Sequence, residues 1–182
     1  MHLWTSHPIQ KSRSADGAAL LGFGLLTGLT ALAGGHSTRK GLSPWYERLN
    51  KPPFQPPAWL FAPAWTFLYG LIATSGWRIY RRSRSSRRRG ALGLWAAQLG
   101  LNGLWSWLFF GKQRPRAALA DSALLLGAAA AYVPVAHGVD RMAAKLFVPY
   151  VGWLAFATLL NEEIVRRNPS AGAERPAAGA PP

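Results

Sequence analysis

The chain has 182 residues, of which 49% are hydrophobic and 15% charged, and it contains nine Trp but no Cys. A length of this order indicates one domain, and the absence of Cys excludes disulfides, thiol catalysis and Cys-ligated metals. The formal net charge is +14, but much of it is concentrated in an arginine-rich block at residues 78–89, between two apolar runs. This block is typical of a loop at an anionic membrane surface and argues against a nucleic-acid-binding face.

Residues 1–16 are mostly polar, and we expect them to form an N-terminal tail without a cleavable signal peptide. Five apolar runs follow, each about 20 residues long, which is the length a helix needs to cross ~30 Å of hydrocarbon. Because lipid offers no partner to backbone polar groups, we expect every run to be a helix. The runs are residues 17–35, 58–77, 90–111, 117–137 and 146–165.

The stretch that leads into the second run, residues 45–69, reads WYERLNKPPFQPPAWLFAPAWTFLY. Proline lacks a backbone N–H and fixes φ, so the two proline pairs predict an ordered, extended loop in place of a helix or strand. The stretch also carries too much apolar area for a solvated linker, from the aromatic residues Trp45, Tyr46, Phe54, Trp59 and Phe61. We therefore predict that it folds over the mouth of the helical bundle.

The third run has two chemically different faces. Trp95, Gln98, Asn102, Trp105 and Phe109 recur at spacings of three and four, which places them on one side of a helix. Polar side chains in a membrane helix face the bundle interior, so this side is predicted to be a pocket wall. The opposite side predicts a close helix contact, within the chain or with another copy, because it carries small residues: Gly93, Ala97, Gly100 and, with them, Leu104.

The fourth run is almost purely apolar apart from Asp121 near its start. We expect Asp121 to pair with a basic residue near the membrane surface (Lys112, Arg114 or Arg116) or to be a hydrogen-bonded structural acid. Pro134 is expected to kink or end the helix.

The fifth run carries Tyr150, Trp153, Ala157 and Asn161 along one stripe, and two arginines follow it. Residues 169–182 are rich in Ala, Gly and Pro and predict a disordered C-terminal tail. Five crossings would put the two ends of the chain on opposite sides of the membrane. Lys and Arg are almost evenly divided between the sides, so the orientation stays open.

Catalytic and metal-binding patterns are weak. The four His residues show no metal-ligand spacing, Ser106 has no His or acid at helical spacing, and Glu162 and Glu163 lie 100° apart on a helix. Binding is better supported, because aromatic rings on three helices could line a cavity, with Gln98 and Asn102 supplying sparse polar contacts. The residues alone leave an equal alternative, in which the rings only fill the bundle core or form interfacial belts.

Three motifs at long spacing resemble the signature of the TspO/MBR family: residues 45–69, QLGLNGLWSWLFFG at 98–111, and PYVGWLAFATLLN at 149–161. The resemblance implies an all-α integral membrane protein, a bundle of five transmembrane helices with an extended Pro/Trp-rich loop between the first two. The membrane domain would span residues 17–168, and the protein would be multi-pass, in a bacterial cell membrane.

The resemblance also implies a membrane receptor or transporter-like protein that binds porphyrins such as protoporphyrin IX, with a regulatory or stress-sensing role in tetrapyrrole handling. The alternatives are light- and oxygen-dependent porphyrin degradation, with Trp65 and Trp153 as the reactive side chains, and a structural scaffold without ligand. No cofactor is required. The resemblance and the helical faces together give the ligand-binding candidates Tyr46, Trp65, Tyr69, Gln98, Asn102, Trp105, Phe110, Trp153 and Ala157.

Partners follow from the same resemblance. We expect a homodimer, with Gly93, Ala97 and Gly100 as the candidate interface. A sterol is the weaker ligand, because the cholesterol motif of animal members needs a Tyr between its Leu and its basic residue. Here Leu160 and Arg166 are present without that Tyr.

Overall fold

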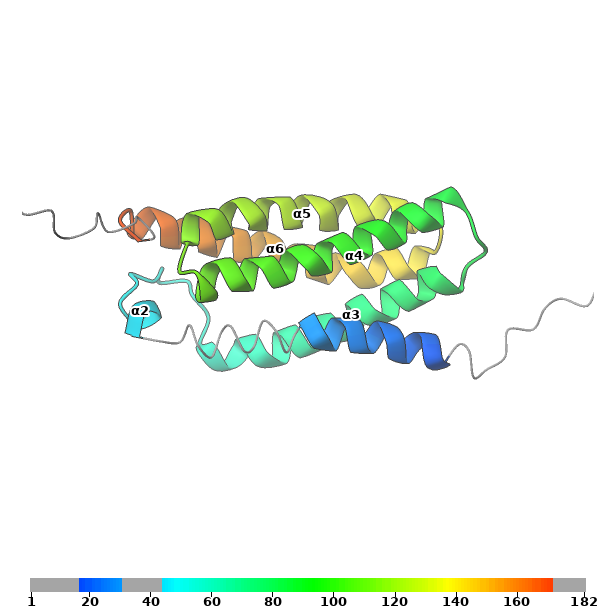
Figure 1. Ribbon diagram of the computed structural model, residues 1–182, viewed down its shortest axis with the longest axis horizontal. Coiled ribbons are helices and arrows are strands. Elements are labelled where there is room, and N and C mark those ends of the chain that lie inside the picture. Colours follow the sequence, from blue (N-terminus) through cyan, green and yellow to red (C-terminus); the bar gives the residue numbers. More distant parts are fainter. Residues whose placement is uncertain (1–16, 31–43, 172–182) are drawn as a thin grey trace, which may run out of the picture.

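The protein is described by a computed structural model, which places residues 17–30 and 44–171. The expected all-α class is confirmed for this described part, where the long helices run side by side along one axis (Figure 1). The elements are a helix at Gly17–Thr30, α2 (Pro44–Glu47), α3 (Ala58–Arg81), α4 (Ser86–Ser106), the π-helical turn η1 (Trp107–Gly111), α5 (Pro115–His137) and α6 (Arg141–Arg167).

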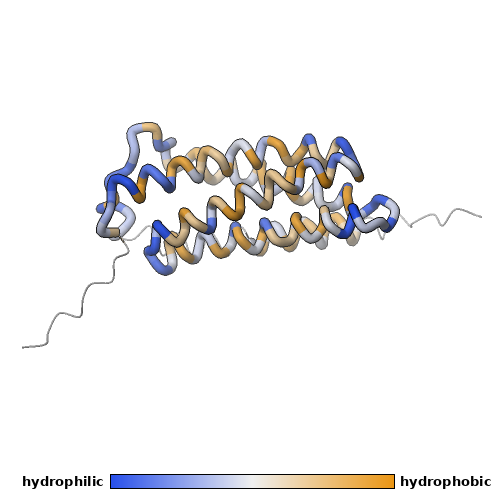
Figure 2. The backbone as a smooth tube through the Cα atoms, turned by 90° about the horizontal axis from the view of Figure 1, so that it is seen from above, coloured by the Kyte–Doolittle hydropathy of each residue, from blue (hydrophilic) through white to orange (hydrophobic). Residues whose placement is uncertain are grey.

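Helix α5 packs against both α4 and α6, while α3 packs mainly on α6. The largest side chains without solvent exposure there are Tyr132, Phe147 and Tyr150. Hydrophobic residues occupy the middle of the helices, and hydrophilic residues collect at the two ends (Figure 2). By length and composition, α5 and α6 are each able to cross a membrane. The full count of five spans stays a prediction, and residues 31–35 of the first run lie outside the described residues.

Helix boundaries differ from the apolar runs at their polar ends. The third helix of the sequence (α4) begins at Ser86, because the Ser85 hydroxyl accepts the backbone N–H of Arg88 as an N-cap. The last helix begins at Arg141, before its apolar run, because Asp140 caps it. In α5, the helix continues past Pro134 and ends at His137.

The proline-rich loop was predicted to be free of helix, and this is wrong at its start. Pro44–Glu47 form one helical turn. Proline is well tolerated in the first turn of a helix, where its missing N–H would have no partner, so Pro44 can begin this turn. Between Glu47 and Ala58 the loop contains no further helix.

A glycine allows α3 and α4 to approach closely. The indole Nε1 of Trp95 donates to the backbone oxygen of Ile72 at 2.9 Å, which places the ring against α3. A Cβ at Gly76 would lie 2.6 Å from two atoms of this ring and 2.8 Å from the Phe23 ring. Only glycine fits here without moving a buried indole.

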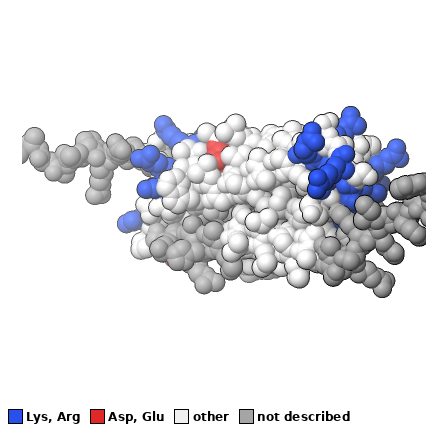
Figure 3. Space-filling model, turned by 45° about the vertical axis from the view of Figure 1, so that its right-hand side comes forward, with Lys and Arg blue, Asp and Glu red and all other residues white. Residues whose placement is uncertain are grey.

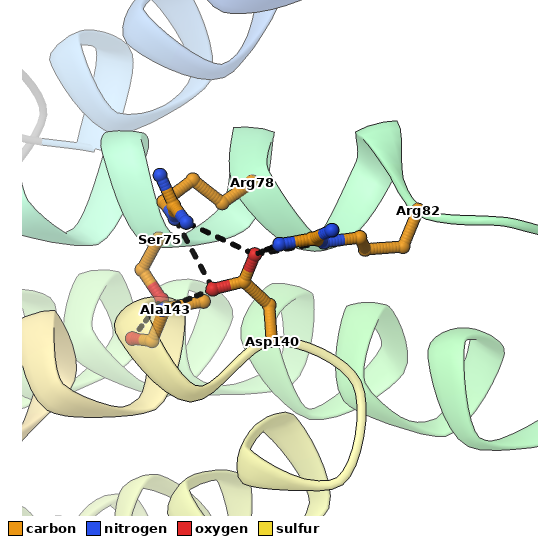
Figure 4. Close-up of polar contacts among 5 residues, drawn as sticks. All are labelled: Ser75, Arg78, Arg82, Asp140 and Ala143. Atoms are coloured by element: carbon orange, nitrogen blue, oxygen red, sulfur yellow. Dashed lines mark hydrogen bonds and ion pairs between the residues drawn. The ribbon is translucent and has the colours of Figure 1, made fainter.

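The turn between α5 and α6 is fixed by Asp140, whose side chain is 2% exposed (Figure 4). Its carboxylate accepts the backbone N–H of Ala143 at 2.9 Å, the Nε and Nη2 of Arg78 at 3.2 and 3.1 Å, and the Nε of Arg82 at 2.8 Å, as well as the Nη2 of Arg82. Burial raises the pKa of Asp140, but the hydrogen bonds from Ala143, Arg82 and Arg78 outweigh it and hold the pKa below its ordinary value.

Gly76→Ala should destabilise the protein by about 1–3 kcal/mol, because the added methyl must displace the Trp95 ring. The measurement is thermal unfolding in detergent. Gly70→Ala is the matched control, since Gly70 is an exposed glycine of the same helix with nothing within 4 Å of its Cβ position. It should be neutral or stabilising through helix propensity. Equal stability of the two variants would contradict the close approach.

Asp140→Asn should lower the free energy of unfolding by roughly 2 kcal/mol at pH 7. Because the folded pKa is depressed, this contribution is present above the unfolded pKa of about 3.9 and is lost as pH falls through the folded pKa. The difference between wild type and variant should therefore shrink below about pH 4. Glu47→Gln, at an exposed position, is the control. A difference that stays constant from pH 7 to pH 3 would contradict the ion-paired Asp140.

Candidate functional site

Four aromatic residues on α3 and α6 form one cluster, here called the tryptophan cluster: Trp65, Tyr69, Tyr150 and Trp153. Trp65 stacks on Tyr69, one turn further along α3, with ring centroids 5.3 Å apart and planes 29° apart. Trp65 also meets Trp153 edge-on at 6.2 Å and Tyr150 at 6.4 Å. Trp65, Tyr69 and Trp153 are partly buried, whereas Tyr150 has no exposed surface.

A polar chain connects this cluster to α4. The Tyr69 hydroxyl donates to Asn102 Oδ1 at 2.9 Å, and Asn102 Nδ2 donates to the Tyr150 hydroxyl at 3.2 Å. Asn102 is 6% exposed. One amide therefore joins α3, α4 and α6 and fixes the orientation of two rings in the tryptophan cluster.

Two buried polar atoms near these helices lack hydrogen-bond partners among the described residues. Gln98 donates its Nε2 to the backbone oxygen of Trp95 at 2.9 Å, but its Oε1 has no partner, and Trp153 Nε1 has none. Buried polar groups in proteins are rarely left unsatisfied. Trp153 therefore offers an indole donor within an aromatic surface.

A second group, here called the loop cluster, consists of Tyr46, Trp105, Phe109 and Phe110. Trp105 stacks on Phe109 at 5.1 Å and meets Phe110 edge-on at 5.9 Å, while Tyr46 of α2 lies 5.7 Å from Phe110. Trp105 Nε1 donates to Asn161 Oδ1 at 2.9 Å. The predicted binding residues are thus divided between two clusters.

The loop is anchored to the end of α6. The backbone N–H of Asn50 donates to Asn168 Oδ1 at 2.9 Å, and Asn168 Nδ2 donates back to the oxygen of Asn50 at 3.1 Å. Within the loop, Gln55 Nε2 donates to the Tyr46 hydroxyl at 3.3 Å. Burial raises the pKa of Tyr46, which this hydrogen bond only partly offsets, so the phenol stays neutral.

The binding candidates from the sequence did not include two rings that connect the clusters. Phe61 packs on the loop cluster and lies 5.9 Å from Trp153, and Phe156 also lies 5.9 Å from Trp153. Phe54 of the loop in turn lies 6.4 Å from Phe156. The position of Phe156 three residues after Trp153 could have indicated a shared face. Ala157, one turn after Trp153, is partly buried.

The expected pairing of Asp121 is wrong. Both its carboxylate oxygens are buried and have no hydrogen-bond partner among the described residues. The side chain is 4% exposed, whereas Arg114 and Arg116 are exposed, and Arg116 donates to the backbone oxygen of Pro169 at 2.9 Å. Helix direction therefore separates the acid from the basic residues that are near it in sequence.

The small-residue face of α4 is open in the described structure. Gly93, Ala97 and Gly100 are exposed, and a Cβ at either glycine would have no neighbour within 4 Å. Trp95, Gln98 and Asn102 on the other face are buried. The division of the two faces follows the predicted spacing.

Comparison with known proteins agrees with the motifs. A model of the TspO/MBR family matches residues 22–167. The translocator protein of Bos taurus is 39% identical over 150 residues, which cover 81% of this chain and 89% of the relative. The tryptophan-rich sensory protein of Cereibacter sphaeroides is 40% identical over 145 residues, covering 79% and 90%. The translocator protein of Homo sapiens is 35% identical over 150 residues, again covering 81% and 89%. By the extent of these matches, this chain is a member of the TspO/MBR family of membrane proteins.

Proposed function

We propose that this protein is a membrane receptor that binds a flat, hydrophobic ligand of the porphyrin class, such as protoporphyrin IX, at the tryptophan cluster. The observation that carries the proposal is the contact between Trp65 and Trp153, with the unpartnered Nε1 of Trp153 at the same place. Two partly buried indoles offer stacking surfaces, and one N–H can orient a polar substituent. The names of the relatives, translocator protein and tryptophan-rich sensory protein, support a receptor or sensor role.

The proposal places the ligand between the helices and the proline-rich loop. Phe61 and Phe156 extend the aromatic surface of Trp153, and Phe156 in turn contacts Phe54 of that loop. Within the tryptophan cluster, Tyr69 is held by its hydrogen bond to Asn102. Gln98, Trp105, Phe110 and Tyr46 would then hold the walls and the cover, with Trp105 and Tyr46 already hydrogen-bonded to protein groups.

The proposal includes five membrane crossings in a bacterial cell membrane. The helices α3 to α6 contain 24, 21, 23 and 27 residues, and at ~1.5 Å per residue each exceeds the ~30 Å of the hydrocarbon core. The described chain begins with the helix Gly17–Thr30 at one end of the bundle and finishes with α6 at the other (Figure 1). This arrangement supports an odd number of crossings.

A sterol is the less favoured ligand. The basic residue of the incomplete cholesterol motif, Arg166, donates to both oxygens of Glu163 at 2.7 and 2.8 Å. Glu163 also accepts from Arg167 at 2.6 Å. The position between Leu160 and Arg166 that would need an aromatic hydroxyl is thus occupied by an acid that binds Arg166.

Replacing both indoles, in Trp65→Ala/Trp153→Ala, should weaken protoporphyrin IX binding by at least about tenfold, because two aromatic contacts of about 1 kcal/mol each are lost. The measurement is quenching of tryptophan fluorescence in detergent. Trp107→Ala is the control, since Trp107 is 48% exposed and lies outside the tryptophan cluster. Unchanged affinity in the double variant would contradict the proposed site.

Gly93→Leu/Gly100→Leu should convert the proposed homodimer to a monomer, because bulky side chains prevent close approach of two α4 helices. The measurement is molar mass by light scattering in detergent. The control is Gly127→Leu, at another exposed glycine with nothing within 4 Å. A dimer that persists at the same protein concentration would rule out this face as the interface.

A further inference from the structure

Basic side chains lie at both ends of the molecule (Figure 3), and one of these groups is at the end where α3 meets α4 and α5 meets α6. In the segments 78–89 and 138–145, Asp140 is the one acidic residue. The arginine-rich block at residues 78–89 contacts the helices at two points. Arg88 donates to the backbone oxygen of Tyr80 at 2.7 and 3.1 Å, and Arg87 lies against Gly138 of the α5–α6 turn. The positive charge is therefore held on ordered backbone.

A cavity of about 200 Å³ opens at this end and is lined by four charged residues, here called the arginine cradle: Arg78, Arg81, Arg82 and Asp140. The Asp140 side chain is 2% exposed, whereas those of Arg78 and Arg82 are 32% and 53% exposed. The carboxylate thus lies beneath the guanidinium groups, which face outward.

The carboxylate cannot satisfy the donors around it. Asp140 accepts one N–H from Ala143, two from Arg78 and two from Arg82 (Figure 4). A carboxylate has about four lone-pair sites, while each guanidinium carries five N–H donors. Asp140 is saturated and neutralises one of the three arginine charges of the cradle, so the cradle retains positive charge and donors for a second anion.

Aromatic residues of the type found at membrane–water interfaces lie beside the cradle. Trp77 and Tyr80 sit on the last turns of α3, and the guanidinium carbons of Arg81 and Arg88 lie 4.7 and 5.0 Å from their ring centroids. Trp and Tyr are enriched at the membrane–water interface. In a chain of a membrane family, these rings mark the headgroup region, and the arginines lie beside or beyond them.

We propose that the arginine cradle binds the headgroup phosphate of an anionic phospholipid, such as phosphatidylglycerol. Guanidinium groups bind phosphate oxygens through paired, charge-assisted hydrogen bonds. A bilayer lipid is favoured over a soluble phosphate because the interface presents lipid phosphates at high local concentration, and its negative surface potential attracts basic segments. Asp140 is a positioning residue: its hydrogen bonds fix the guanidinium groups of Arg78 and Arg82 in the cavity lining. The site is independent of the tryptophan cluster, whose α3 members lie nearer the start of that helix.

The test uses the full-length protein in a non-ionic detergent, titrated with phosphatidylglycerol, phosphatidylcholine or inorganic phosphate. Native mass spectrometry counts the bound lipid. Phosphatidylglycerol should bind at least about tenfold more tightly than phosphatidylcholine, as expected for a few charge contacts. Equal affinity for the two lipids would overturn the proposal. Inorganic phosphate that displaces phosphatidylglycerol at equal concentration would also overturn it, because the site would then take soluble anions.

Two charge-matched variants separate a defined site from diffuse attraction. Arg81→Gln removes one charge from the cavity lining, and Arg84→Gln removes one charge from the exposed loop at the same end. Arg81→Gln should weaken phosphatidylglycerol binding about tenfold and Arg84→Gln about twofold or less. Equal effects of the two variants would overturn the proposal.

A third variant controls for misfolding caused by an unpaired buried carboxylate. Asp140→Asn/Arg78→Gln/Arg82→Gln also removes one net positive charge, and it leaves no buried carboxylate without a partner. It should keep the protein folded, as measured by circular dichroism, and should lose the preference for phosphatidylglycerol. A preference retained by this triple variant would show that the lipid binds elsewhere.

Discussion

The proposed site depends on the hydrogen bonds of the Asn102 side chain. A primary amide inside a helical bundle needs hydrogen-bond partners. Burying an amide without them costs on the order of 2–7 kcal/mol, as judged from transfer out of water. Asn102 finds them on two other helices, accepting from Tyr69 and donating to Tyr150. These bonds place the Tyr69 and Tyr150 rings, and Trp65 packs on both. One polar residue on α4 thus organises aromatic residues of α3 and α6 that are far apart in sequence.

The position of the rings follows from this arrangement. Trp65, Tyr69 and Trp153 of the tryptophan cluster are only partly buried, whereas Tyr132 and Phe147 in the core have no solvent exposure. Rings that only filled the interior would resemble Tyr132, with hydroxyl and ring both enclosed. Trp65 and Trp153 instead retain exposed surface, and Trp153 retains an unpartnered donor. The loop rings, by contrast, have their polar atoms satisfied at Tyr46 and Trp105. This contrast favours the tryptophan cluster as the place for a ligand.

Helical periodicity was enough to predict the faces of α4 and the stripe on α6, because side chains at spacings of three and four share a face whatever the tertiary structure. It could not predict Asp140 as a clamp, since its partners Arg78 and Arg82 are 62 and 58 positions away in sequence. It also failed for Asp121, where proximity in sequence suggested partners on the surface but the helix turns the side chain inward. Contacts such as Phe61 with Trp153 depend on how α3 crosses α6, which no local pattern contains.

The most direct test of the central claim is the ¹⁵N–¹H NMR spectrum of the indole groups, assigned for the nine Trp residues, with and without protoporphyrin IX. We expect the largest shift at Trp153 Nε1–H, which has no partner among the described residues, with a ring-current shift at Trp65. The Trp105 and Trp95 signals should shift less than that of Trp153, because their N–H groups already donate to Asn161 and Ile72. A spectrum in which Trp105 shifts while Trp153 and Trp65 do not would contradict ligand binding at the tryptophan cluster.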